Sequence, residues 1–346
     1  MANKILSDLF DTMYTTTYAR NLPQRDYLGN ALFPNITTNE LSYKLLKAAE
    51  GLPVIANIHA FGTEADQGSR EGVEIQTGKI PGIKRKIPLD EEFLVRLNRA
   101  GLGDLESVRN QIFGDLKQMV DGVMARMEKM KMDAIAKGAI SIDDGKIIAN
   151  VDFQVPDAHK DTLTGTSAWN DTANSNPLEW IQTNTETVES NTGVRPERAL
   201  TSRKVVSYIL QNENVRAQIL GNNYTSSIIT QNQLNELLSR MGLPQIATYD
   251  LKYRSQAKSG AYSTGRFFPE DRFVMLPPET LGEQLMGPTP EGLLDENIEA
   301  TQVPGLYAKT YKASSDPVSI MTLAGATSMT TFPRADEIFI GVVLDE

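Results

Sequence analysis

The stretch GDLESVRNQIFGDLKQMVDGVMARMEKMKMDAIAKG, residues 103–138, carries the clearest structural pattern in this chain of 346 residues. Its apolar side chains recur at intervals of three, four or seven residues, which is the spacing of one face of an α-helix. That face consists of Val108, Ile112, Met119, Val123, Met127 and Met130. Acidic residues stand near the start, lysines stand near the end, and Gly138 follows as a stop signal, in agreement with the helix dipole. The stretch predicts one helix over residues 103–137, about 50 Å long at about 1.5 Å per residue.

Patterns typical of β-structure lie on both sides of this helix. After it, residues 139–153 predict a hairpin that turns at Asp144-Gly145. Before it, β-branched runs between residues 52 and 89 surround a polar, glycine-rich stretch at 62–72, which predicts a long hairpin with a polar tip. An isolated two-stranded ribbon is marginally stable in water, and this one has few partners in its own chain. We therefore expect it to pack on a neighbouring molecule.

The N-terminal segment and the C-terminal half of the chain differ in the secondary structure that their sequences predict. Residues 1–50 mix short apolar clusters with proline and glycine and show no sustained period, so we expect an arm that docks on something else. The C-terminal half alternates helix-capping residues with short apolar strands and predicts a mixed α+β domain. Its predicted helices begin after Asn176, Ser202 and Thr230. Its predicted strands lie near 249–253, 272–276, 305–311 and 338–344.

The composition narrows the classes of function. There are 34 Lys and Arg against 44 Asp and Glu, a formal net charge of −10, which disfavours a dedicated DNA-binding protein. The absence of cysteine excludes disulfides, thiolate nucleophiles and cysteine zinc sites. No run of about 18 uncharged apolar residues occurs, and no signal-peptide pattern opens the chain, so we expect a soluble, unexported protein.

Residues that could carry chemistry are few. His59 and His159 are the only histidines, too little for a two-histidine metal motif or a serine triad. Asp143-Asp144 could bind a metal ion, but a polar pair before a glycine also suits a hairpin turn, which we favour. The methionines of the long helix could form a docking face for a partner or pack in the core, and we favour the core. We therefore expect no catalytic residue, no metal and no cofactor.

Five stretches, taken in order, resemble the lambda-like phage major capsid protein E family. They are AFGTEADQGSREG (60–72) with IPGIKRKIPL (80–89), MDAIAKGAISIDDGKIIANVDF (132–153), NTGVRPERALTS (191–202), RFFPEDRFVMLP (266–277) and DPVSIMTLAGATSMTTFPRADEIFIGVVL (316–344). The resemblance covers nearly the whole chain. It implies an α+β, Hong Kong 97-type phage capsid fold, in which the long helix is the spine helix and the long hairpin is the extended loop.

The domain boundaries that the resemblance implies are as follows. They are an N-terminal arm at 1–50, the extended loop at 51–92, a peripheral domain with the spine helix and hairpin at 93–160, and an axial domain at 161–346 whose C-terminal strands could return to the peripheral domain. Some shells of this fold cross-link a loop lysine to a neighbour. Here the tip between Gly62 and Gly72 carries Arg70 and no lysine, so we do not expect that bond.

The function implied by the resemblance is that of a structural subunit rather than an enzyme. Hexamers and pentamers of the chain would close an icosahedral shell in the bacterial host cytoplasm and become part of the virion. Its partners would be a separate scaffolding protein, a portal, a decoration protein, and packaged double-stranded DNA held without specific binding. A separate scaffold is expected because only about fifty residues precede the loop, and they lack heptads.

The residues expected to contact neighbouring subunits are Glu64, Asp66, Arg70 and Glu71 of the loop tip, and Lys84, Arg85 and Lys86 of its second strand. The tip could instead be a solvated loop, and the basic run could meet nucleic acid or pair with acidic residues of nearby strands. Two alternatives for the whole protein remain. One is an encapsulin-like nanocompartment shell with a protein cargo, and the other is a soluble hydrolase that uses carboxylates for acid–base catalysis.

Overall fold

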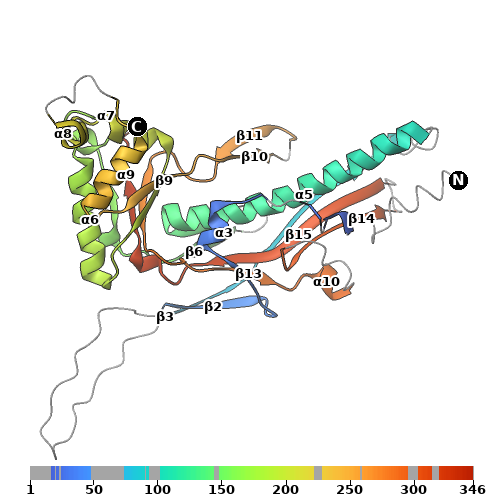
Figure 1. The fold of residues 1–346 in the computed structure, drawn as a ribbon. Coiled ribbons are helices and arrows are strands. Elements are labelled where there is room, and N and C mark those ends of the chain that lie inside the picture. Colours follow the sequence, from blue (N-terminus) through green and yellow to red (C-terminus); the bar gives the residue numbers. More distant parts are fainter. Residues whose placement is uncertain are drawn as a thin grey trace, which may run out of the picture. The chain divides into compact units, whose positions relative to one another are not determined.

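The computed structural model describes residues 17–19, 21–22, 25–47, 74–89, 91–92, 102–143, 148–221, 228–257, 259–294, 303–313 and 319–345. Contacts divide the chain into two units (Figure 1). Unit 1 comprises residues 1–44, 77–131 and 282–331, and unit 2 comprises residues 45–76, 132–281 and 332–346. Residues 282–331 group with unit 1 and residues 132–160 group with unit 2. The domain boundaries expected from the resemblance stay a prediction.

Unit 1 is built on a five-stranded sheet whose longest strand is β15. One stretch of β15 pairs with both β4 and β14, and its last residues pair with β13, which in turn pairs with β1. Every one of these contacts is antiparallel except the parallel pair β1/β13. The strands are β1 (Asn35–Thr37), β4 (Gly82–Leu89), β13 (Glu283–Gly287), β14 (Leu306–Ala313) and β15 (Ser319–Thr331). The short helix α10 (Pro290–Leu294) lies between β13 and β14 in the chain.

The predicted long helix is confirmed as α5 (Leu102–Lys137), whose residues up to Lys131 belong to unit 1. The predicted apolar face is confirmed over the part whose side chains are described, because Ile112, Met119, Val123 and Met127 are all buried. The helix ends at Gly138, which has φ +66° and donates its N–H to the carbonyl of Ala134. A side chain there would be strained, which explains why glycine is the stop residue.

The N-terminal segment packs on α5 of its own chain, so the expectation of an arm docked on something else is wrong for its described residues. Residues further along the N-terminal segment contact residues further along α5. The rings of Tyr18 and Phe113 stack at 4.0 Å, and Arg25 Nε lies 3.6 Å from Asp121 Oδ2. Local periodicity could not show this, because each contact joins residues about a hundred positions apart.

Further along, helix α3 (Leu28–Leu32) is fixed to α5 by buried polar groups. The backbone N–H of Gly29 donates to Glu128 Oε1 at 3.2 Å, and Lys131 Nζ donates to Asn30 Oδ1 at 2.8 Å. Burial lowers the pKa of Lys131 to about 8, although the Glu128 carboxylate acts in the opposite direction. Gly29 is required by the close approach, because a Cβ there would lie 2.3 Å from Glu128 Oε2.

The long hairpin expected between residues 52 and 89 is only partly correct. Strand β3 (Glu74–Lys79) pairs with β2 (Ser42–Lys47), which lies upstream of the predicted partner strand. Strand β4 pairs over its full length with β15, so the second strand of the predicted hairpin has an extensive partner in its own chain. The predicted strand at 52–61 and the loop tip lie outside the described residues.

Unit 2 contains a second five-stranded sheet with the order β7-β16-β12-β8-β9. Its strands are β7 (Lys160–Thr162), β8 (Arg198–Thr201), β9 (Gln245–Thr248), β12 (Arg272–Leu276) and β16 (Phe339–Val342). Its helices are α6 (Pro177–Thr192), α7 (Arg203–Gln211), α8 (Glu213–Leu220) and α9 (Gln231–Arg240). The buried faces of these helices join the sheet in one apolar cluster, which includes Trp169, Ile181, Val205, Leu234 and Phe273.

Two hairpins complete unit 2. The first, β5 (Ala139–Asp143) with β6 (Ile148–Asp152), confirms the predicted hairpin after α5, while its turn lies outside the described residues. The second is β10 (Lys252–Gln256) with β11 (Tyr262–Arg266). The predicted caps Ser202 and Thr230 accept N–H groups of α7 and α9. Asn176 is the N-cap residue of α6 as predicted, but its side chain accepts no N–H group of the helix and donates instead to Glu179 Oε2 at 2.8 Å.

A substitution on the buried face of α5 tests this packing. Val123→Asp places a carboxylate at a fully buried position and should lower the free energy of unfolding by several kcal/mol or prevent folding. Gln118→Asp, at an exposed position of the same helix, should change it by no more than about 0.5 kcal/mol. Urea unfolding followed by circular dichroism measures both. Equal stability of the two variants would show that this face of α5 is not packed in the core.

Candidate assembly surfaces

The basic run of β4 does not form a single site. Successive side chains of a strand point to opposite faces of the sheet, so Lys84 and Lys86 lie on one face and Arg85 lies on the other. Arg85 packs against α5, since a Cβ on Gly122 would lie 3.1 Å from its Cδ. The three residues predicted as one contact set are therefore divided between two environments.

Lys84 belongs to a row of side chains that crosses three strands. Tyr307 of β14 is opposite Gly325 of β15, which is opposite Lys84 of β4. Because Gly325 has no side chain, the ring of Tyr307 covers it, and a Cβ at Gly325 would lie 2.6 Å from the Tyr307 hydroxyl. Lys84 Nζ donates to Glu291 Oε1 of α10 at 2.6 Å, which closes the row.

The pKa values of Glu291 and Tyr307 are shifted because the side chains of this row lie close to one another. Burial opposes ionisation of Glu291, but the hydrogen bonds from Lys84, from the backbone and from Tyr307, together with the charge of Lys84, outweigh it and hold the pKa of Glu291 below its usual value. Burial and the nearby Glu291 carboxylate both raise the pKa of Tyr307 above its usual range. Lys84 is thus neutralised within its own chain. Lys86, the other basic side chain of this face of β4, has no ion-pair partner among the described residues and can meet another molecule.

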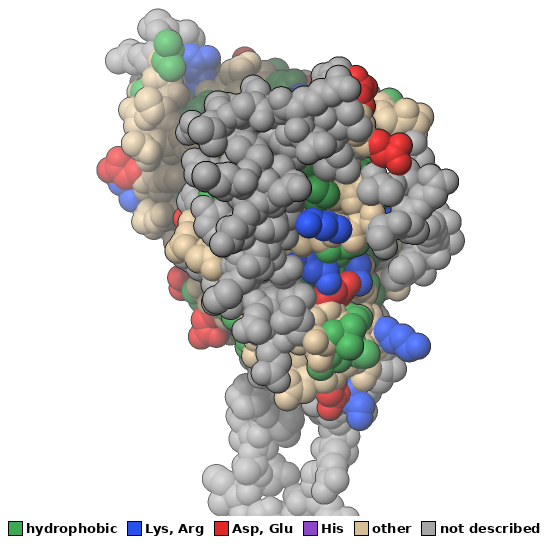
Figure 2. All heavy atoms as spheres, turned by 90° about the vertical axis from the view of Figure 1, so that its right-hand side faces the viewer, with side chains coloured by type: hydrophobic (Ala, Val, Ile, Leu, Met, Phe, Trp, Pro, Cys, Tyr) green, Lys and Arg blue, Asp and Glu red, His purple; other side chains and the backbone are tan. Residues whose placement is uncertain are grey.

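The face that carries Lys84 and Lys86 is named the lysine face. It continues onto β14 with Lys309, whose ammonium lies 5.8 Å from the centre of the Tyr311 ring. Lys84, Lys86 and Tyr311 are exposed, and Lys309 is half-buried. Helix α10 adds Leu293 and Leu294, which are 76% and 89% exposed. Figure 2 shows Lys and Arg side chains gathered beside exposed hydrophobic ones on one side of the molecule. Such a mixture of exposed apolar and charged groups is typical of a protein-binding surface.

The other predicted contact residues, Glu64, Asp66, Arg70 and Glu71, lie outside the described residues. Sequence reasoning did not identify Glu291 or Tyr307 as part of the surface. Their link to Lys84 depends on the pairing of β4, β14 and β15, which joins parts of the chain more than 200 residues apart. No local signal in the sequence points to that pairing.

The described residues offer little for catalysis. Among them there is no group of three or more His, Cys, Asp or Glu that could hold a metal ion. His159 is buried, which lowers its pKa, and its Nε2 lies 3.0 Å from the side-chain amide nitrogen of Asn191. In the same described portion no helix is both long and apolar enough to cross a membrane.

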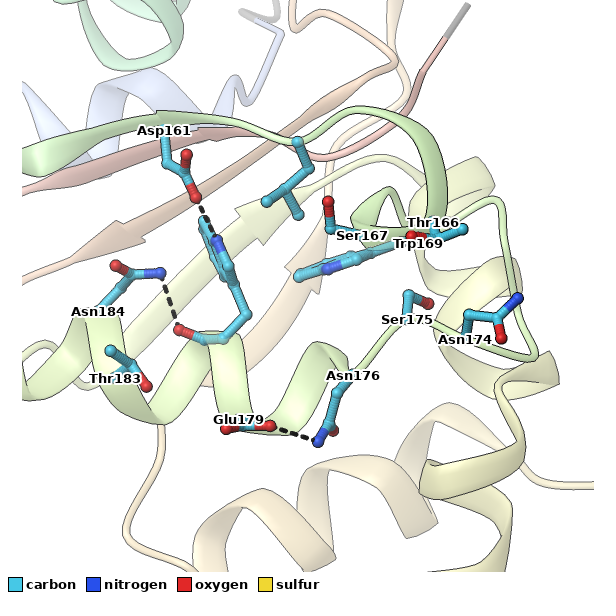
Figure 3. A pocket seen from close by; sticks show the side chains of 12 residues that line it. Asp161, Thr166, Ser167, Trp169, Asn174, Ser175, Asn176, Glu179, Thr183 and Asn184 are labelled. Carbon is cyan, nitrogen blue, oxygen red and sulfur yellow. Dashed lines mark hydrogen bonds between the residues drawn. The ribbon is translucent and has the colours of Figure 1, made fainter.

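A cavity of about 460 Å³ lies in unit 2 between η2 (Gly165–Ser167) and the start of α6 (Figure 3). Several of its polar side chains are bonded to other side chains or to the backbone. Asp161 accepts the indole N–H of Trp180 at 2.7 Å, and Asn184 donates to the Trp180 carbonyl at 2.8 Å. No histidine, lysine or arginine is among the residues that line it.

The glycine beneath Tyr307 provides a test of the lysine face. Gly325→Ala forces Tyr307 away from its place and should lower the free energy of unfolding by about 1–3 kcal/mol. Gly82→Ala is the matched control, because no atom lies within 4 Å of its Cβ position and the residue sits in the same sheet. Thermal melts of both variants give the comparison. A Gly325→Ala protein as stable as the control would contradict the row described above.

Comparisons with known proteins agree with this architecture. Two crystal structures resemble the chain over nearly its whole length. One is described as a capsid protein of a prophage of E. coli CFT073 and has a TM-score of 0.60 at 14% sequence identity. The alignment covers 96% of this chain and 97% of that protein. The other, a phage-related protein from Bordetella bronchiseptica RB50, has a TM-score of 0.50 at 18% identity, with 95% of each chain covered. At such identities the likeness shows the fold, which is the Hong Kong 97-type capsid fold expected from the sequence.

No curated protein sequence matches the chain. The model of one protein family, described as phage major capsid protein E, matches residues 11–343. The match spans both units, the spine helix α5 and the central strand β15. The chain therefore belongs to the phage major capsid protein E family.

Proposed function

We propose that this capsid protein forms hexameric and pentameric capsomers that close an icosahedral shell around phage DNA in the host cytoplasm. Capsid proteins are structural subunits that self-assemble into shells, and their place is the virion. Unit 1, with the spine helix α5, corresponds to the peripheral domain in this proposal, and unit 2 corresponds to the axial domain. A separate scaffolding protein, a portal and a decoration protein are the further partners that we propose.

The observation that carries the proposal is the anchoring of the strands that flank the loop segment in the sequence. Strands β2 and β3 pair at its base, and β4 follows immediately, paired with β15 at eight positions. The base of the loop is thereby held in its own subunit. The Ile80 N–H donates to the Leu41 carbonyl at 2.9 Å beside this ribbon, which adds to the anchoring. A long polar segment on a firm base suits contact with a neighbouring subunit.

Charge complementarity indicates which surface of the neighbouring subunit the loop tip contacts. The loop tip carries three acidic residues, Glu64, Asp66 and Glu71, and one basic residue, Arg70, so its net charge is 1 − 3 = −2. The lysine face offers the opposite charge. We propose that the tip of one subunit contacts the lysine face of the next, where Lys86 and Lys309 meet its carboxylates.

The acidic chain also fits a container for DNA. A wall with a net charge of −10 repels a polyanion on average, so packaged DNA would stay mobile during filling. An encapsulin-like shell would share the fold, but the family match is to a phage capsid protein, which favours a genome as the content. The nucleic acid content of purified shells separates the two.

Deletion of Thr63–Glu71 tests the role of the loop. We expect the deleted subunit to keep its circular dichroism spectrum and melting temperature, while closed shells are lost when it is co-expressed with its scaffolding protein. Arg70→Glu should leave assembly nearly unchanged, because it makes the tip more acidic where it meets the lysine face, and one exposed charge pair contributes about 1 kcal/mol or less. Sedimentation of each lysate gives the yield of shells. Shells of normal size and stability from the deleted protein would refute the loop contact.

A further inference from the structure

The hairpin of β10 and β11 carries its charge on one face. Within the described part of the chain these two strands pair with each other and with no other strand. Alternation places Lys252, Arg254 and Tyr262 on one face, and Ser255 and Ser263 on the other. The segment 251–269 contains four basic residues and no Asp or Glu, so its net charge is +4 and the rest of the chain has −10 − 4 = −14.

Contacts within the hairpin hold the basic face in a fixed arrangement. The Arg254 guanidinium lies over the Tyr262 ring, 4.5 Å from its centre, and the hydroxyls of Ser255 and Ser263 lie 2.7 Å apart. Tyr253 covers Gly265 on the other face, where a Cβ would lie 2.6 Å from the ring. A two-stranded ribbon organised in this way needs little further ordering on binding.

The base of the hairpin is attached to the body of unit 2. Asp250 accepts hydrogen bonds from Arg266 and, at 3.1 Å, from the backbone N–H of Arg203 at the start of α7. Arg266 is therefore neutralised inside the subunit. Neither Lys252 nor Arg254 forms an ion pair with any residue that the structure describes. These two cations and Tyr262 are presented outward, and the three residues are defined here as the basic face.

Helix α6 carries negative rather than positive charge on its exposed side. It contains no lysine or arginine, and one side is buried in the core of unit 2 through Leu178, Ile181 and Val188. Its exposed side carries Glu179 and Glu186, seven residues apart and so about 10 Å along the same face. Glu186 accepts a hydrogen bond from Gln182 at 3.0 Å.

Neither of these two glutamates pairs with a cation within the described residues. A third glutamate of the helix, Glu189, is already paired with Arg195. Glu179, Gln182 and Glu186 form the acidic stripe. It is therefore the part of α6 whose negative charge is offset by no basic side chain among the residues that the structure describes.

The two surfaces lie on opposite sides of unit 2. Figure 1 shows α6 on one side of the unit 2 sheet and the hairpin β10/β11 extending from the other. The basic face of a subunit therefore cannot reach its own acidic stripe. A head-to-tail contact between copies brings different surfaces together and generates a ring when the rotation closes.

We propose that the basic face of the β10/β11 hairpin of one subunit docks on the acidic stripe of α6 of a neighbouring copy. This inference rests on the proposed assembly into capsomers and names a contact between axial domains within them. Arg254 and Lys252 pair with Glu186 and Glu179 across the interface, and Tyr262 supplies apolar area between the charges. The hairpin, which pairs with no further strand in the described part of its own subunit, gains a surface on which to pack. A basic two-stranded ribbon also fits a DNA groove, but an acidic stripe in the same chain, which no cation of the described residues pairs, favours a second copy.

Charge reversal provides the test. Arg254→Glu and Glu186→Arg, each alone, should reduce the yield of capsomers and shells several-fold, and the double variant should restore much of that yield. Lys204→Glu, at an exposed position of α7 outside both surfaces, is the matched control and should assemble normally. Sedimentation and native mass spectrometry of the co-expressed proteins measure the yields. Normal assembly of both single variants would refute the contact.

The absence of native cysteine permits a second, direct measurement. Shells of an Arg254→Cys, Glu186→Cys variant, treated with a flexible bismaleimide, should give ladders of linked subunits on a denaturing gel. The pair Arg254→Cys with Glu213→Cys, whose second position is exposed at the start of α8, should not. Closed shells without a ladder would overturn the contact and leave the proposed function intact, whereas failure of the wild type to form any shell would refute the function. Normal assembly of Arg254→Glu with a loss of packaged DNA would assign the hairpin to nucleic acid and overturn the proposal.

Discussion

The antiparallel pairing of β15 with β4, β13 and β14 is the interaction on which unit 1 depends. A single strand of 13 residues, Ser319–Thr331, binds segments that begin as early as Gly82. This pairing fixes the lysine face on one side of the sheet and the contact with α5 on the other. The same strand anchors β4, and so holds the base of the extended loop. A shell protein needs such an attachment, because a loop that contacts a neighbouring subunit can hold that subunit in place only if the base of the loop is itself fixed.

Small side chains allow this strand to occupy the centre of the sheet. Gly325 makes room for the Tyr307 ring, and Ala324 and Ala326 are buried on the face toward α5. Larger residues would separate the sheet from the helix or displace Tyr307. The composition that makes β15 fit also makes it hard to recognise, because Thr, Ser, Ala and Gly give no alternation of apolar and polar residues. The absence of alternation explains why β15, the longest strand in the described part of the chain, was not predicted.

Local patterns predicted the elements that are stabilised by local interactions. Helix α5 has a regular apolar face, a charge gradient along its axis and a glycine stop, so its limits could be predicted within one residue. The caps Ser202 and Thr230 were predicted for the same reason. Pairings over long distances in the chain could not be predicted, and they include β4 with β15, β2 with β3, and the N-terminal segment with α5. The basic run Lys84 to Lys86 was found in the sequence, but only the strand geometry separates Arg85 from the two lysines. The acidic loop tip lies outside the described residues, so its contact remains a proposal.

The account holds that this chain builds a closed shell from copies of itself, and electron microscopy of the purified protein tests that claim most directly. The protein would be expressed with its scaffolding protein and imaged after purification, and the particles would be reconstructed with symmetry imposed only after it is detected. The account predicts closed particles of uniform size with hexameric and pentameric capsomers, and density for the loop of each subunit over its neighbour. Monomers or irregular aggregates under the same conditions, from protein with a normal circular dichroism spectrum, would contradict it.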